Sequence, residues 1–128
     1  MNADFGTTNA ILVENDHPKL SGKELKNRIA DKTAAGDYGA AFKYVSFFDA
    51  NGTMEGKNNA GAHNFGTWSI NDLDGSISVQ WDAGWDATTT HAYDVEGEIK
   101  LYDSDTGLWR TTLYSFKDGR QELVIMTK

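Results

Sequence analysis

The residues of this 128-residue chain best suited to acid–base chemistry surround His91. His91 is flanked by threonines and followed by Tyr93 and Asp94, and an imidazole gains or loses its proton near neutral pH. If the segment is a strand, alternation places His91 and Tyr93 on one face. His91 could then act as an acid or base with Asp94, although a lone histidine in a strand is more commonly an ordinary hydrogen-bonded residue.

No metal or cofactor motif accompanies these residues. The other histidines, His17 and His63, lack the short His-x-His or His-x-x-x-His spacing of zinc ligands, and the chain has no cysteine. The segment Asp49-Ala50-Asn51-Gly52 resembles the start of a calcium loop but lacks the remaining ligands, so it predicts a turn. Phosphate loops, dinucleotide fingerprints and nucleophile elbows are absent. We therefore predict no metal and no cofactor.

Two Trp-Asp pairs, four residues apart, form a second candidate site. They are Trp81-Asp82 and Trp85-Asp86, with Gly84 between them to let the backbone turn. An indole face beside a carboxylate could cradle an ammonium group or a sugar. Alternatively, one tryptophan closes the mouth of a barrel and the aspartates cap a turn.

Aromatic side chains form the third and largest candidate set. Trp and Tyr can fill a core, or they can line a cavity that holds an apolar or aromatic ligand. The residues predicted to bind such a ligand are Trp68, Trp81, Trp85, His91, Tyr93, Tyr102, Trp109 and Tyr114.

Turns rich in Asp, Asn and Gly indicate the elements that position these side chains. Four such turns are predicted, at residues 49–52, 72–75, 103–107 and 117–119. Between them residues 76–81 alternate between apolar and polar, as in a half-buried strand. The predicted strands are 42–48, 53–57, 65–70, 76–81, 88–94, 95–103, 108–116 and 120–126.

A short helix is predicted before the strands, over residues 21–32. Ser21 and Glu24 match a capping box, and Leu25 and Ile29 share one face. The chain therefore divides into an irregular arm, 1–18, and a single β-barrel domain, 19–128. The predicted fold class is mainly β: an antiparallel meander of about eight strands closed into a lipocalin-like barrel, with one short N-terminal α-helix. Two packed sheets are the alternative.

The order of these segments resembles that of a known group of proteins. A capped helix precedes an aromatic strand ending at residues 47–52, then a polar strand, then Gly66-Thr67-Trp68-Ser69-Ile70 and a strand that closes on Trp81. Over residues 20–115 this resembles small exported bacterial proteins with a lipocalin-like, calycin-type barrel, most of them uncharacterised. The resemblance implies a cup-shaped barrel and a periplasmic location, with no established chemistry.

The charge and hydropathy of the chain argue against some classes of binding partner. The net charge of -7 argues against nucleic acid, and no Lys or Arg lies between Lys57 and Lys100. No apolar run is long enough to span a membrane, and no signal peptide is evident. We expect a periplasmic or secreted protein if Met1 replaces a removed signal peptide, and a cytoplasmic one otherwise. The sequence does not set the oligomeric state.

The leading hypothesis is non-enzymatic binding of a small apolar or aromatic ligand in a barrel cavity. One alternative is a small barrel enzyme of the isomerase or cyclase type that uses His91 as its acid or base. Another is a protein-interaction module with a solid barrel and exposed aromatic residues around Trp85. The sequence leaves open whether the protein is an enzyme.

Overall fold

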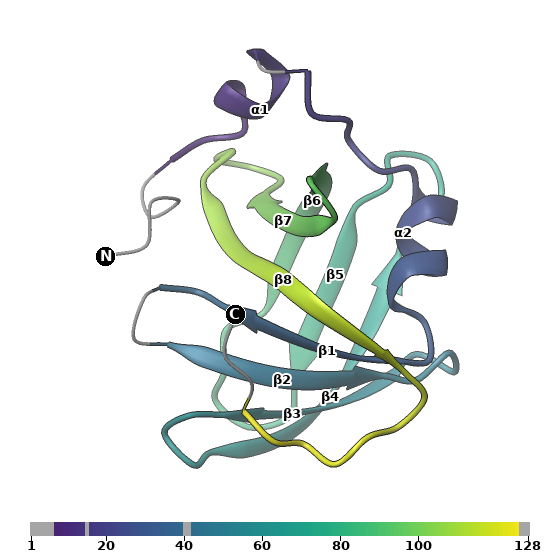
Figure 1. The fold of residues 1–128 in the computed structure, drawn as a ribbon, viewed down its shortest axis with the longest axis vertical. Helices are drawn as coiled ribbons and strands as arrows, with labels where there is room; N and C mark the ends of the chain where they lie inside the picture. The colour runs from purple at the N-terminus through teal and green to yellow at the C-terminus, as the bar shows by residue number, and fades with distance from the viewer. Residues whose placement is uncertain (1–6, 15, 40–41, 126–128) are drawn as a thin grey trace.

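Eight antiparallel strands close into one barrel in a computed structural model that describes residues 7–14, 16–39 and 42–125 (Figure 1). The strands are β1 (Lys32–Asp37), β2 (Lys43–Phe48), β3 (Thr53–Asn58), β4 (His63–Ile70), β5 (Ile77–Trp81), β6 (Thr88–Val95), β7 (Glu98–Asp103) and β8 (Trp109–Asp118). Each strand pairs with the next along the chain, and β1 pairs with β8. This meander confirms the predicted fold class and rules out two separate sheets.

The predicted number of strands is correct, but one predicted strand is not formed and one observed strand, β1, was not predicted. β1 lies where the sequence predicted the end of the helix and no strand, whereas the predicted last strand, 120–126, is irregular over residues 120–125, and residue 126 lies outside the described residues. The sequence of β1 is Lys-Thr-Ala-Ala-Gly-Asp, which has no large apolar residue to reveal alternation. Because β1 already pairs with β8, the barrel offers no free edge for a strand after β8.

Turn chemistry explains most of the meander. Of the four predicted turns, those at 49–52, 72–75 and 103–107 join β2 to β3, β4 to β5 and β7 to β8. In the first, the Asp49 carboxylate accepts the Asn51 backbone N–H at 2.9 Å, as a local side-chain turn requires. The turn at 117–119 ends β8 but leads into no strand. The tight β6–β7 hairpin turn, at residues 96–97, was not predicted.

Helix α2 (Gly22–Ile29) closes one end of the barrel. Its capping box is present: the Ser21 hydroxyl accepts the Glu24 N–H at 3.1 Å, and the Glu24 carboxylate accepts the Ser21 N–H at 3.0 Å. Leu25 and Ile29 are fully buried against the barrel core. The helix ends at Ile29 rather than at residue 32.

The outside of the barrel is covered in two places by the segments that flank the strands. Helix α1 (Ala10–Glu14) places Leu12 against aromatic side chains of β6, β7 and β8. After β8, residues 119–125 pass over the outer face of β1 and β2, where Gln121 donates its N–H to the Thr33 hydroxyl and Arg120 lies over the Phe47 ring at 4.7 Å. Among the described helices, none is long and apolar enough to cross a membrane.

Candidate ligand-binding cavity

The barrel encloses a cavity of about 760 Å³ that opens at the end opposite α2. The inward side chains of α2, Leu25 and Ile29, form its floor. The mouth is set by Tyr38 after β1, by the β5–β6 connection (residues 82–87), and by the start of β8. Most of the wall is apolar or aromatic, and the residues that line it include Phe48, Met54, Ile77, Val79, Leu101, Leu108 and Leu113.

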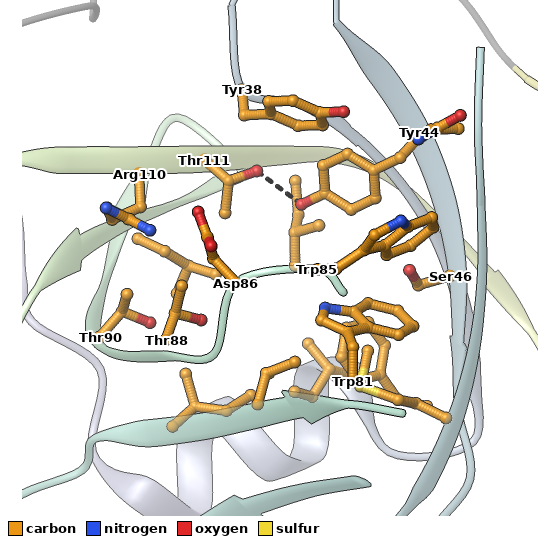
Figure 2. Close-up of a pocket in the computed structure, with 18 of the residues that line it drawn as sticks. Tyr38, Tyr44, Ser46, Trp81, Trp85, Asp86, Thr88, Thr90, Arg110 and Thr111 are labelled. Carbon is orange, nitrogen blue, oxygen red and sulfur yellow. Dashed lines mark hydrogen bonds between the residues drawn. The ribbon is translucent and has the colours of Figure 1, made fainter. Parts of the chain in front are cut away.

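Two tryptophans form one side of the cavity near its mouth. Trp81 ends β5, Trp85 lies in the β5–β6 connection, and their rings meet edge to face at 4.7 Å (Figure 2). The Trp81 ring also lies directly against the backbone of β3, where a Cβ on Gly56 would be 2.5 Å from Trp81 Cη2. Gly56 is therefore needed for the indole to lie flat along the wall, which leaves the centre of the barrel open.

A chain of hydroxyl groups crosses the wall from β2 to β8. The Tyr44 hydroxyl lies 2.5 Å from Thr111 Oγ1, and Thr111 donates its own proton to the Asp37 carbonyl oxygen at 2.7 Å. A threonine hydroxyl has one proton, so Tyr44 must be the donor in its contact with Thr111. Burial raises the pKa of Tyr44 well above its ordinary value, and the phenol is therefore neutral at physiological pH.

Ser46 follows Tyr44 on the inward face of β2 and is almost fully buried. Its hydroxyl has no hydrogen-bond partner within the part of the chain that the structure describes. A Cβ on Gly56 would be 3.0 Å from Ser46 Oγ, so this hydroxyl lies at the edge of the Trp81 ring. A buried hydroxyl without a partner costs about 1–3 kcal/mol.

An irregularity in β8 turns a charged side chain toward the mouth. Leu101 of β7 pairs with Thr111, whereas Tyr102 pairs with Trp109, so Arg110 is the extra residue of a bulge. In a regular strand, adjacent side chains point to opposite faces. Because a bulge redirects side chains, the three consecutive residues Trp109, Arg110 and Thr111 all line the cavity. Nothing in the sequence signals this bulge.

The cavity lining has one acidic and one basic side chain among the described residues, Asp86 and Arg110. In the view of Figure 2, Asp86 lies between Arg110 and Tyr44. Both are exposed to solvent. The other polar side chains that line the cavity are uncharged: the hydroxyls of Tyr44, Ser46, Thr88, Thr90 and Thr111, and the Asn58 amide.

Three of the eight predicted ligand-binding residues line the cavity: Trp81, Trp85 and Trp109. Trp68 points inward but packs edge to face on Phe48, donates its indole N–H to the backbone, and borders a polar hollow of about 450 Å³ rather than the barrel cavity.

Tyr93, Tyr102 and Tyr114 lie elsewhere. Tyr93 and Tyr102 meet edge to face at 5.7 Å and pack with Leu12 on the outside of the barrel. Tyr114 falls at a second irregularity, because β1 pairs with Leu113 and Ser115 on either side of it. None of the three lines the cavity.

The structure does not bring His91 and Asp94 together as an acid–base pair. They are three residues apart on β6 and therefore project from opposite faces. His91 lines neither hollow, and Asp94 pairs with Arg28 of α2 at 3.6 Å. Among the described residues, no group of three or more His, Asp or Glu side chains could hold a metal ion.

Comparisons with known protein families, with curated proteins and with solved structures gave no match for this chain.

Proposed function

We propose that this protein binds a small, largely apolar or aromatic ligand in the cup of its barrel and is not an enzyme. The observation that carries this proposal is the cavity of about 760 Å³ inside the barrel. Its volume lies within the range of about 300–1,000 Å³ that ligand pockets occupy, and its wall combines apolar surface with a few polar groups.

The placement of the large aromatic side chains supports binding over simple core filling. Small barrels of eight strands can be filled completely by side chains. Here Tyr93 and Tyr102 pack outside the barrel, Trp68 packs edge to face on Phe48, and Trp81 lies along the wall against Gly56. The space at the centre is therefore left for another molecule.

The lipocalin-like character of the barrel belongs to this proposal. An eight-stranded up-and-down barrel that holds one small ligand is the arrangement of lipocalins. Export from a bacterial cell, which the sequence resemblance implied, is part of the same proposal. The position of His91 outside both hollows gives the isomerase or cyclase alternative no support, and Trp85 is half-buried against Trp81 rather than displayed for a protein partner.

A titration with the apolar fluorophore N-phenyl-1-naphthylamine tests the proposal. We expect saturable, one-to-one enhancement of its emission with the native chain. Val79 projects into the cavity and its neighbour Gln80 projects outward. Val79→Trp should therefore weaken binding at least about tenfold, whereas Gln80→Trp, the matched control, should leave it unchanged. No saturable enhancement, or equal effects of both substitutions, would overturn the proposal.

A further inference from the structure

The hydrogen bonds of Tyr44 give the cavity a fixed polarity at one point of its wall. Its proton is committed to Thr111 Oγ1, because the Thr111 proton is committed to the Asp37 carbonyl oxygen, which can only accept. The Tyr44 oxygen therefore retains only acceptor capacity. Toward a ligand, Tyr44 is an acceptor, and it cannot serve as a donor without breaking its hydrogen bond to Thr111.

The other uncharged hydroxyls of the wall set no such preference. Those of Ser46, Thr88 and Thr90 can each donate or accept by rotating about the C–O bond. Thr111 has its proton engaged and already accepts from Tyr44. Among the hydroxyls of the wall, Tyr44 is thus one that offers a ligand an acceptor and no donor.

The charges of the wall favour a neutral ligand. Asp86 and Arg110 are opposite in sign and stand at the mouth, exposed to water. Deeper in the cavity the described lining has no charge to pair with an ionic group, and an ion moved there would lose its hydration without compensation. The indoles of Trp81 and Trp85 provide flat apolar surface for an aromatic ring.

We propose that the cavity selects a neutral aromatic compound that donates a hydrogen bond, from an N–H or O–H group, to the hydroxyl oxygen of Tyr44. This inference rests on the proposed function and specifies the class of ligand.

Carbazole and dibenzofuran test it, because these tricyclic compounds share one shape but carry a bridging N–H and a bridging oxygen, respectively. Equilibrium dialysis gives the ratio of their affinities for each variant. Tyr44→Phe removes the acceptor and should lower the preference for carbazole by about three- to tenfold. Thr111→Val frees the Tyr44 proton to meet the dibenzofuran oxygen, so it should also lower that preference. Tyr93→Phe, the matched control on the outside of the barrel, should leave the ratio unchanged.

The outcomes separate this inference from the function on which it rests. If both compounds bind and their ratio is the same in the native chain, Tyr44→Phe and Thr111→Val, the inference is wrong and the binding function stands. A native preference for dibenzofuran that depends on Tyr44 also overturns the inference. If neither compound binds the native chain, the proposed function fails and the inference fails with it. Circular dichroism verifies that each variant is folded.

Discussion

Replacing Val79 by tryptophan should leave the stability of the protein unchanged or raise it. Val79 is half-buried and faces the cavity of about 760 Å³. If the indole buries about 60 Å² more apolar surface than valine does, the gain is about 1.5 kcal/mol. Ordering the larger side chain offsets about 0.5 kcal/mol of this, which leaves a net gain of about 1 kcal/mol.

Ala92 provides the matched control. It projects inward from β6, is fully buried, and belongs to the packed core rather than to the cavity wall. The same indole has no space there, so Ala92→Trp should cost about 3 kcal/mol or more, at the upper end of the usual cost of overpacking.

Urea unfolding monitored by far-ultraviolet circular dichroism measures both changes, because the signal does not depend on the added tryptophan. The slope of the transition should remain constant, so that the midpoint reports stability. A loss of more than about 2 kcal/mol in Val79→Trp, similar to that in Ala92→Trp, would show that side chains already fill the barrel and would refute the reasoning.

Three further changes probe the wall and the outer cover. Ser46→Ala removes a buried hydroxyl that has no hydrogen-bond partner among the described residues, so it should raise the free energy of unfolding in urea by up to about 1 kcal/mol. A decrease of more than about 1 kcal/mol would show that this hydroxyl forms a hydrogen bond in solution. Gly56→Ala places a methyl group 2.5 Å from Trp81 Cη2 and should push the indole into the cavity, so dialysis should show at least about threefold weaker binding of dibenzofuran; unchanged affinity would contradict this geometry. Burial raises the pKa of Glu55, but hydrogen bonds, chiefly from Arg120, outweigh it and hold this pKa below its ordinary value of 4.5. Glu55 therefore stabilises the fold above that value, and its contribution is lost as the pH falls through the lowered pKa. Glu55→Gln should flatten the dependence of unfolding free energy on pH below about 4.5, and an unchanged acid limb would count against this ion pair.

The architecture could be predicted from the sequence where local chemistry determines it. The turns at 49–52, 72–75 and 103–107 depend on Asp, Asn and Gly, and the capping box at Ser21 sets the start of α2. β1 could not be predicted, because its small side chains are buried on both faces by α2, the barrel core and the C-terminal segment. Only the three-dimensional arrangement of those parts makes Lys32–Asp37 a strand.

Sequence alternation indicated which residues share a face, but not which face is the inside. Tyr93 and Tyr102 were expected at a cavity, yet they face outward and pack with Leu12 of α1. Tyr44 and Ser46 were missed even though they alternate with Phe48 on a strand that was predicted. Their pattern could have revealed them once the inward face of that strand was known.

Arg110 shows the limit of periodicity as a guide. Strict alternation along β8 would send Arg110 and Trp109 to opposite faces. The bulge opposite Leu101 and Tyr102 allows both to border the cavity. A bulge depends on the fit between two strands, which the sequence of one strand does not record.

A crystal structure of the protein soaked with dibenzofuran tests the central claim most directly. The account predicts electron density for one molecule of the compound inside the barrel, in contact with Trp81 and Trp85 and above the floor formed by Leu25 and Ile29. A barrel interior filled by its own side chains, with no density for the compound, would contradict it.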